Sequence, residues 1–257
     1  MLTGKTVIVT GAASGIGAAT ARLVRGWGGR VLAVDRHEPA ELVDGFFRAD
    51  LSDRASIDAV AAALPAGAHG LANIAGLPPT RPAAEVLRVN LVGLKHLTRQ
   101  LVPKLAPGAA IVNLASLAGL DWPEAVSAIR AGEELGFDEV EAFCDRHGIT
   151  GARAYVFAKE ALIAWTIRQR WAWRDRGIRM NAVSPGPVDT PILPDFMASL
   201  GAKTVAVMAA MDRPGRPEEI APAVGFLLSD ASAWISGANL AVDGGLLAHV
   251  LHHRHGL

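Results

Sequence analysis

Two side chains that can exchange protons stand four positions apart, Tyr155 and Lys159, and Tyr155 is the single tyrosine of the 257-residue chain. In a helix with about 3.6 residues per turn, this spacing places both side chains on one face and within reach of each other. A free phenol has a pKa of about 10, and a neighbouring ammonium lowers that pKa by favouring the phenolate. The pair therefore indicates a general acid or base, although a core tyrosine beside a lysine with an extended stem gives the same spacing.

A glycine-rich turn at residues 10–17, TGAASGIG, follows the first apolar run. Gly11, Gly15 and Gly17 carry no Cβ, so the backbone can turn tightly and approach a ligand, and a helix starting here points unpaired N–H groups at an anion. The spacing differs from the G-x-G-x-x-G fingerprint, and glycines also gather in ordinary turns. A glycine turn between a strand and a helix nevertheless predicts a pyrophosphate site.

Asp35 ends the second apolar run, RVLAVD. A carboxylate at this place accepts hydrogen bonds from the adenosine ribose and repels a 2′-phosphate, which predicts NAD as the cofactor rather than NADP. Arg36 follows directly, and its guanidinium would hold that phosphate, while Asp35 could also cap a turn. A dinucleotide beside an ionisable phenol predicts proton transfer at an alcohol or carbonyl oxygen, coupled to hydride transfer at its carbon.

The elements that must position these residues follow from the alternation of short apolar runs with longer stretches rich in alanine, leucine and arginine. Strands are expected at residues 6–10, 30–34, 70–74, 109–115, 178–183 and 239–243. Helices are expected near residues 15–28, 54–64, 85–105, 155–176 and 217–229. Apolar strands separated by helices favour parallel pairing, so we predict a doubly wound parallel α/β sheet. No repeat or linker divides the chain, which predicts a single domain over residues 1–257.

Two long segments interrupt this alternation. Residues 117–154 predict two short helices inserted before the helix of Tyr155, and residues 190–213 predict a substrate lid, because long connections in compact folds are commonly functional. The lid residues expected to close over an apolar substrate are Ile192, Leu193, Phe196, Met197 and Leu200. Trp122 in the first segment is a candidate for stacking on an aromatic ring of the substrate.

Composition excludes several classes of partner. Lysine plus arginine and aspartate plus glutamate number 25 each, which leaves no basic surface for nucleic acid or anionic lipid. The longest stretch without charged residues, 59–80, contains prolines and glycines that argue against a membrane span. The one cysteine, Cys144, rules out an internal disulfide and, with no signal-peptide pattern at the N-terminus, fits the cytoplasm.

Histidines gather in the C-terminal tail, at positions 249, 252, 253 and 255. Metal sites combine histidine with cysteine or carboxylate ligands, and the tail offers no such complement at a suitable spacing, so we predict no metal site. The tail is expected to edge the substrate pocket or to contact a second subunit.

Several motifs occur together and in one order along the chain. They are TGAASGIG at 10–17, Asp35, ANIAG at 72–76, the VN pair ending at Asn90, NLAS at 113–116, YVFAK at 155–159, SPGPVDTP at 184–191 and VDGG at 242–245. In this order they resemble the short-chain dehydrogenases/reductases over nearly the whole chain. The resemblance implies a Rossmann-like fold and an NAD-dependent enzyme that interconverts an alcohol and its carbonyl compound.

The resemblance also implies a role for each site residue. Tyr155 would be the general acid/base, Lys159 would lower its pKa and bond the nicotinamide ribose, and Ser116 would orient the substrate oxygen. Asn90 would hold a water against Lys159, whereas Ser116 could instead serve only to cap a loop. The implied cofactor contacts are Gly11, Ser14, Gly15, Ile16, Gly17, Asp35, Asp50, Leu51, Asn73, Ala75, Gly76, Tyr155, Lys159, Pro185, Val188 and Thr190.

The chain departs from the family pattern in two places. The usual NNAG is ANIAG here, and the 117–154 insertion separates Tyr155 from Ser116 by more residues than in most members. A bacterial subgroup with an insertion at this point includes 3-alpha-hydroxysteroid dehydrogenase/carbonyl reductase and coniferyl alcohol dehydrogenase, and residues 161–196 resemble the latter type. A small apolar substrate is implied, for which an aromatic allylic alcohol and a steroid hydroxyl are both suitable.

Assembly and catalysis each leave two alternatives. The family commonly pairs through the helices that carry Asn90 and Tyr155, which implies a homodimer or homotetramer, and the insertion would cover that surface, wall the substrate pocket, or do both. A non-catalytic dinucleotide sensor with the same fold is the rival class of function. Such a sensor would have no need for the complete set of four candidate catalytic residues.

Overall fold

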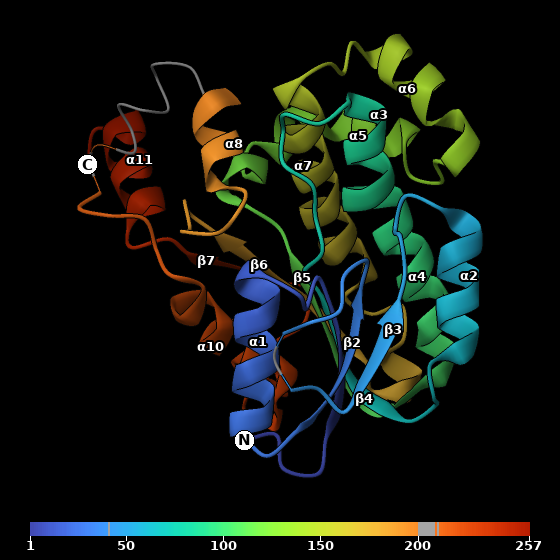
Figure 1. Ribbon diagram of the computed structural model, residues 1–257. Helices are drawn as coiled ribbons and strands as arrows, with labels where there is room; N and C mark the ends of the chain where they lie inside the picture. Colours follow the sequence, from blue (N-terminus) through green and yellow to red (C-terminus); the bar gives the residue numbers. More distant parts are fainter. Residues whose placement is uncertain (41, 200–208, 210) are drawn as a thin grey trace.

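A parallel sheet forms the centre of the computed structural model, which describes residues 1–40, 42–199, 209 and 211–257. Within these residues the sheet has seven strands in the order β3-β2-β1-β4-β5-β6-β7 (Figure 1). The strands are β1 Thr6–Thr10, β2 Arg30–Asp35, β3 Gly45–Arg48, β4 Ala68–Asn73, β5 Leu105–Leu114, β6 Arg179–Pro185 and β7 Asn239–Val242. Every neighbouring pair in this order is parallel, which confirms the predicted doubly wound sheet.

Helices cover both faces of this sheet (Figure 1). The α-helices are α1 Gly15–Gly26, α2 Arg54–Ala63, α3 Ala83–Leu87, α4 Leu94–Leu101, α5 Val126–Ala131, α6 Val140–His147, α7 Ala152–Gln169, α8 Leu193–Ser199, α10 Pro217–Leu228 and α11 Leu246–His255. On one face α1 packs against α10, and on the other face lie α2, α4 and α7. No helix in the described ranges combines the length and the apolar character needed to cross a bilayer.

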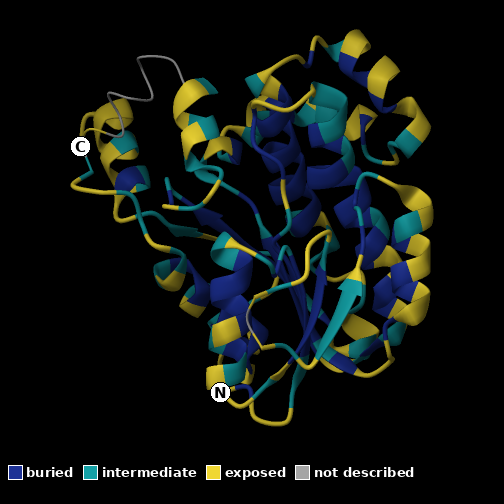
Figure 2. Ribbon diagram, in the orientation of Figure 1, coloured by how far each residue is buried: buried dark blue, intermediate teal, exposed yellow. Residues whose placement is uncertain are grey.

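The core consists of two apolar layers separated by the sheet. Val7 and Val9 of β1 join the layer that contains Val224 of α10, whereas Ile8 between them joins the layer that contains Leu162 of α7. Successive side chains of a strand point to opposite faces, and in a parallel sheet both faces are covered. Figure 2 shows the result: the central strands are mostly buried, the edge strand β3 is only partly buried, and many exposed residues lie on the outer sides of the helices.

The predicted strands all overlap observed ones, but three elements were missed, namely β3, α8 and α11. The edge strand β3 has only four residues, Gly45–Arg48, of which three are half-buried and Arg48 is exposed, and it gives no long apolar run. The C-terminal helix α11 lies in the histidine-rich tail, whose apolar positions we did not interpret as a helix face. The single helix expected at 85–105 is instead α3, a π-helical turn at Arg88–Gly93, α4 and a 3-10 turn.

The insertion at 117–154 contains the two short helices that were predicted, α5 and α6, with 3-10 turns around them. It packs on the outer side of α3, α4 and α7. The Arg88 guanidinium donates to the Phe137 carbonyl at 3.2 Å and contacts the Glu141 carboxylate at 2.5 Å. The Lys95 ammonium of α4 donates to the Glu133 carbonyl, and burial there lowers the pKa of Lys95 to about 8.

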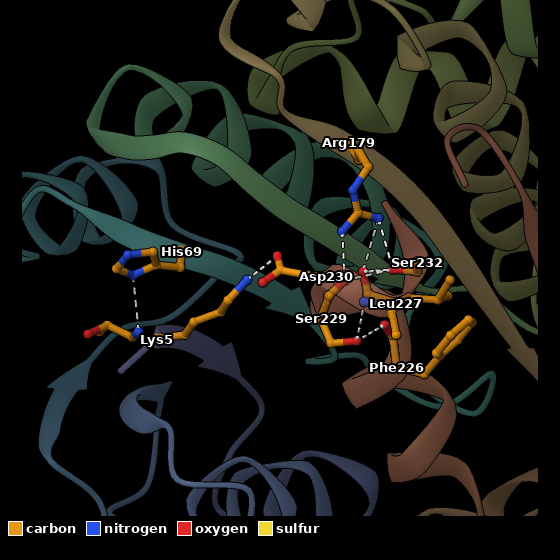
Figure 3. A network of polar contacts seen from close by, with 10 residues as sticks. Lys5, His69, Arg179, Phe226, Leu227, Ser229, Asp230 and Ser232 are labelled. Carbon is orange, nitrogen blue, oxygen red and sulfur yellow. Dashed lines mark hydrogen bonds and ion pairs between the residues drawn. The ribbon is translucent and has the colours of Figure 1, made fainter. Parts of the chain in front are cut away.

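A polar network fastens the amino-terminal end of the sheet (Figure 3). Arg179, the first residue of β6, donates to the Ser229 carbonyl at 3.1 Å and to the Ser232 hydroxyl at 3.0 Å. Lys5, which precedes β1, forms an ion pair with Asp230 in the same turn after α10. These contacts join β1 and β6 to the end of α10 and leave the opposite, carboxyl-terminal end of the sheet free for ligands.

Candidate functional site

The first cavity lies where the strand order changes direction, beyond the carboxyl ends of β1, β2 and β4, and has a volume of about 500 Å³. This is the usual place for a ligand in a doubly wound sheet. Its lining contains most of the predicted cofactor contacts: Gly11, Ser14, Gly15, Ile16, Gly17, Asp35, Asp50, Leu51, Ala75, Gly76 and Thr190. The structure therefore brings together residues from four separate motifs of the sequence.

The glycines of the first turn are required by close contacts. A Cβ on Gly17 would lie 1.9 Å from the Gly11 carbonyl oxygen, and a Cβ on Gly11 would lie 2.8 Å from the Ala75 backbone. Gly11 and Gly15 also have positive φ angles of 71° and 51°, which residues with a side chain rarely adopt. The turn then continues directly into α1, whose N-terminal N–H groups face this cavity and suit a pyrophosphate.

Asp35 is held in one orientation at the edge of the first cavity. One carboxylate oxygen accepts the Ala13 N–H at 3.0 Å, and the other accepts the His37 N–H at 3.0 Å. Arg36 lines the same cavity and is exposed, so both an acceptor for ribose hydroxyls and a cation for a 2′-phosphate are present. These residues fit a nicotinamide dinucleotide, and their chemistry is compatible with either form of it.

Asp50 lines the adenine side of the expected site. Burial alone would raise the pKa of its carboxyl group, but hydrogen bonds from the Ser52 hydroxyl and N–H outweigh burial and lower the pKa, with help from the Arg36 charge. Asp50 is therefore an anion fixed by its own turn, as expected for a residue that positions a ligand through a rigid loop.

Asn73 is the predicted cofactor contact that the structure does not bring to either cavity. Its side chain is buried, and the amide nitrogen donates to the Thr98 hydroxyl and to the side-chain oxygen Oδ1 of Asn113, both at 2.9 Å. Ile74, which the sequence analysis did not propose, lines both cavities instead. The side chains alternate along β4, so the residue after Asn73 faces the ligand side while Asn73 faces α4 and β5.

The second cavity adjoins the first and has a volume of about 710 Å³. Several residues line both, among them Ile16, Gly76, Leu77, Leu114 and Thr190, so the two cavities form one continuous cleft. Of the remaining predicted site residues, Asn90 lines neither cavity, and the others line the second one: Ser116, Tyr155, Lys159, Pro185 and Val188. A cofactor in the first cavity would thus extend toward the candidate catalytic residues in the second.

Tyr155 and Lys159 share one face of α7, as their spacing predicted. The Lys159 ammonium lies 5.5 Å from the centre of the Tyr155 ring and donates to the Leu114 carbonyl at 2.6 Å. Both side chains are buried, with 8% and 4% of their surface exposed. Burial lowers the pKa of Lys159 to about 8 and raises the pKa of Tyr155 to about 12.

The direction of the Tyr155 shift differs from the sequence-based expectation. The expectation considered only the charge of Lys159, which favours a phenolate, and not the loss of water around both groups. Desolvation is the largest influence on the pKa of Tyr155, and a hydrogen bond with Ser116 lowers the pKa by less than burial raises it. In this structure the phenol is therefore protonated at neutral pH.

Ser116 fills one of the two roles considered for it, the loop cap, and its role toward the substrate oxygen stays a prediction. It follows β5, and its hydroxyl oxygen accepts the Ala118 N–H at 3.2 Å, which caps the 3-10 turn Leu117–Gly119 at the start of the insertion. The same side chain lines the second cavity and bonds Tyr155. The cap fixes the hydroxyl where a substrate oxygen could meet Ser116 and Tyr155 together.

Asn90 lies in the π-helical turn between α3 and α4 and is buried. Its side-chain oxygen accepts the Leu77 N–H at 2.7 Å, and its nitrogen donates to the Leu77 carbonyl at 3.0 Å. Asn90 thus clamps the loop after β4 that forms part of both cavities. The predicted contact with Lys159 through a water stays a prediction.

The lid segment reaches the second cavity through α8. Ile192, Leu193 and Phe196 line the cavity, and the Phe196 ring meets the Tyr155 ring edge to face at 4.7 Å between centres. Met197 is exposed and does not line it. Leu200 lies outside the described residues, as do 201–208 and 210 of the same segment.

The C-terminal tail was expected to edge the substrate pocket or to contact a second subunit, and the structure places it at the second cavity as the helix α11, which was not predicted. Lining residues come from α11 and from the insertion beside it: Leu246, Leu247, Val250, Leu251 and Arg254 of α11, and Leu117, Ala118, Leu120 and Asp121 of the insertion. The apolar α11 residues are spaced by one and four positions, which is the spacing of one helix face. That spacing, which places the tail at the edge of the pocket, could have been recognised in the sequence.

Trp122 does not line the second cavity, so the proposal that it stacks on the substrate is wrong for this structure. Its ring packs instead against the small apolar cluster of Ala115, Ile163 and Ala182. Trp122 begins a 3-10 turn directly after Asp121, and this turn directs the indole toward the protein interior. Within the described ranges, no group of three or more His, Cys, Asp or Glu residues could hold a metal ion.

Comparison with known proteins identifies the family. The family model described as short chain dehydrogenase matches residues 5–128, and the one described as Enoyl-(Acyl carrier protein) reductase matches residues 140–247. The chain belongs to the short-chain dehydrogenase/reductase family. Coniferyl-alcohol dehydrogenase of Pseudomonas sp. (strain HR199 / DSM 7063) is 41% identical over 95% of this chain and 97% of the relative.

Other relatives show the same architecture with different substrates and cofactors in their names. The 3-alpha-hydroxysteroid dehydrogenase/carbonyl reductase of Comamonas testosteroni is 30% identical over 93% of this chain and 95% of the relative. The crystal structure of 3-alpha-hydroxysteroid dehydrogenase from Pseudomonas sp. B-0831 with NADH superposes with a TM-score of 0.84 at 28% identity, covering 98% of this chain and 99% of that one. A putative 2-deoxy-d-gluconate 3-dehydrogenase from Agrobacterium tumefaciens with bound NADP has a TM-score of 0.75 at 26% identity, covering 96% and 98%.

Proposed function

We propose that this enzyme uses NAD to interconvert an aromatic allylic or secondary alcohol and its carbonyl compound. The observation that carries the proposal is the cleft itself, in which Ser116, Tyr155 and Lys159 adjoin a glycine-lined cavity bounded by Asp35. A hydroxyl, a phenol and an ammonium that surround one point can transfer a proton to or from a substrate oxygen placed there. NAD, when bound, supplies the acceptor for the hydride that leaves the carbon.

In oxidation, the Tyr155 oxygen takes the proton of the substrate hydroxyl while Ser116 holds the same substrate oxygen. Lys159, with a pKa of about 8, carries its charge at neutral pH and stabilises the phenolate that this step requires. In reduction, the phenol returns its proton to the carbonyl oxygen. The raised pKa of Tyr155, about 12, keeps the phenol protonated near neutral pH, which is the form that reduction requires.

The preference for NAD rests on Asp35. Because its carboxylate is fixed by the Ala13 and His37 N–H groups, it cannot turn away from a 2′-phosphate without breaking two hydrogen bonds. The Arg36 side chain is exposed and not fixed by comparable hydrogen bonds to the described residues. Its charge therefore offsets the repulsion between Asp35 and a 2′-phosphate only in part. One neighbour was crystallised with NADH and another with NADP, so the proposed preference rests on Asp35.

The substrate proposal is a coniferyl-alcohol-like compound, with a hydroxysteroid as the second candidate. The second cavity is large and mostly apolar, and the lid helix α8 places an aromatic ring, Phe196, against Tyr155. The 41% identity to coniferyl-alcohol dehydrogenase favours the first candidate, and the 30% identity to the hydroxysteroid enzyme supports the second. We further propose that 190–213 closes over the bound substrate and that the chain forms a homo-oligomer.

One assay tests this proposal. Reduction of NAD and of NADP is followed at the nicotinamide absorbance with a panel of cinnamyl-type alcohols and hydroxysteroids, for the native enzyme and for Tyr155→Phe. We expect turnover with NAD and a loss of at least about 100-fold in kcat for the variant, because the proton acceptor is gone. Binding of NAD without turnover of any compound would support a dinucleotide sensor instead.

A further inference from the structure

The second cavity contains a charged pair that the proposed chemistry does not use. Among its described lining residues, only Asp121, Lys159 and Arg254 carry a full charge, and Lys159 belongs to the proton-transfer site. The Arg254 guanidinium lies 3.1 Å from the Asp121 carboxylate. An otherwise apolar pocket with a few placed polar groups is the usual design of a site that orients its ligand.

The pair lies at the solvent side of the cavity. The side chains of Asp121 and Arg254 are each 52% exposed, whereas Tyr155 at the other side is 8% exposed. Asp121 comes from the insertion, five residues after Ser116, and Arg254 comes from the last turn of α11. A substrate whose alcohol meets Tyr155 would therefore direct its opposite end toward this pair.

The charges around Arg254 define which group the pair would accept. Asp121 raises the pKa of Arg254 through a hydrogen bond and its charge, and Glu124 adds to this effect, so acidic groups outnumber the cation here. A carboxylate on the substrate would be repelled by Asp121 and Glu124. A neutral hydroxyl can donate to the Asp121 carboxylate and accept from the Arg254 guanidinium at the same time.

We propose that Asp121 and Arg254 form a specificity subsite that binds a neutral hydroxyl group at the far end of an apolar alcohol substrate. The inference rests on the proposed function, because it takes the alcohol carbon to lie at Tyr155. It adds a requirement to that function: the preferred substrate carries two oxygen groups, one at each end of an apolar body. A role in stability alone would be minor, since exposed ion pairs contribute little.

The test compares two alcohols that differ only at the far end, 4-hydroxycinnamyl alcohol and cinnamyl alcohol, in the NAD assay. We expect the native enzyme to prefer the hydroxylated alcohol in kcat/KM by roughly 10-fold, the worth of a half-exposed hydrogen bond to a charged group. Asp121→Ala and Arg254→Leu should each reduce this preference to about 2-fold or less, mainly by raising KM for the hydroxylated alcohol.

A matched control comes from another surface pair. Arg99 and Glu134 lie 2.9 Å apart with comparable exposure, and neither lines a cavity of the cleft. Arg99→Leu and Glu134→Ala should leave the preference unchanged. If the Asp121 and Arg254 variants also leave it unchanged while both alcohols are oxidised, the subsite is disproved and the proposed function stands.

The opposite case, in which the proposed function fails, still allows the subsite to be tested. If no alcohol or hydroxysteroid is turned over, the proposed function fails. Binding of 4-hydroxycinnamyl alcohol, measured by the quenching of tryptophan fluorescence, then decides on the subsite. A dissociation constant that rises about 5-fold or more in Asp121→Ala would support it, and an unchanged constant would overturn it.

Discussion

Burial controls the proton chemistry of the two ionisable groups on α7 more strongly than their closeness does. Water is lost around both Tyr155 and Lys159, and each pKa moves toward the neutral form of its group, to about 12 and about 8. The hydrogen bond from Lys159 to the Leu114 carbonyl leaves its ammonium fewer partners than water would provide. The buried charge of the Lys159 ammonium therefore lowers the stability of the folded protein.

Replacing this lysine should stabilise the protein while it abolishes turnover. A shift of the Lys159 pKa from 10.5 to about 8 corresponds to a cost of about 3 kcal/mol at neutral pH. The lost bond to Leu114 offsets part of this gain, so we expect Lys159→Met to raise the free energy of unfolding by about 1–2 kcal/mol. Urea denaturation near neutral pH measures the change.

The pH dependence gives this prediction its control. The unfolded chain keeps a Lys159 pKa near 10.5, so below about 8 both states are charged and the full cost of burial is present. Between about 8 and 10.5 the unfolded state binds the extra proton, so the native enzyme gains stability as pH rises and the advantage of Lys159→Met shrinks. Tyr155→Phe, which keeps the ammonium, should retain the native pH dependence, and a constant advantage across this range would contradict the argument.

Asp35 is expected to set the choice of cofactor. Asp35→Ser removes the negative charge and keeps a hydroxyl that can accept one of the two N–H bonds now made to the carboxylate. With Arg36 left beside the site, the ratio of kcat/KM for NAD over NADP should fall by about 10- to 100-fold. Steady-state kinetics with both cofactors measures this ratio, and a preference of the native enzyme for NADP would show that Arg36 dominates.

At the scale of elements, the catalytic helix α7 is held by an unusually close backbone contact with the start of the insertion. The 3-10 turn Leu117–Gly119 lies directly against α7, and a Cβ on Gly119 would approach the Lys159 carbonyl carbon to 2.6 Å. Ser116 caps the same turn. The turn therefore sets the distance between the Ser116 hydroxyl and the Tyr155 phenol.

Gly119→Ala should separate these two elements. Backbone atoms cannot move aside as a flexible side chain can, so we expect a loss of about 2–3 kcal/mol in the free energy of unfolding and a fall in kcat larger than any change in KM. Gly26→Ala is the matched control, since a Cβ there meets nothing within 4 Å at the end of α1. Chemical denaturation and steady-state kinetics of both variants test the claim, which fails if Gly119→Ala behaves like the control.

The insertion lies against the helices through which the family resemblance implies that subunits pair. The insertion packs over α3 and α4 through Arg88, Lys95 and their partners, so the chain itself covers part of the face that the family resemblance assigned to subunit pairing. The same insertion also contributes Asp121 to the wall of the second cavity. The insertion therefore walls the pocket, and subunit pairing through that face stays a prediction.

At the scale of the whole molecule, the charges balance. The 25 basic and 25 acidic side chains give a formal net charge of +0 at pH 7, and the isoelectric point is about 7.1. We expect the solubility of the native protein to be lowest near neutral pH and to rise on either side, because net charge of either sign keeps molecules apart. Precipitation by polyethylene glycol across pH measures this, and a steady change in one direction would contradict it.

The sequence allowed the fold and most of the cleft to be predicted for a definite physical reason. Glycine turns, strand-end carboxylates and a helical Tyr-Lys pair depend on local geometry, so Gly17, Asp35 and Tyr155 lie where their neighbours in the chain require. The differences from these expectations arose where tertiary context decides. The burial of Tyr155 reversed its expected pKa shift, Asn73 faces the core, and Trp122 turns inward.

The cleft draws its parts from two sources in the chain. Groups that handle the dinucleotide and the proton stand at the ends of sheet strands and on the helix packed against them, whereas the outer wall of the second cavity comes from the insertion and α11. Neither of those two segments contributes a strand. Evolution can therefore exchange the wall without rebuilding the reaction centre, and divergence of substrate among relatives of this enzyme should concentrate in these two segments.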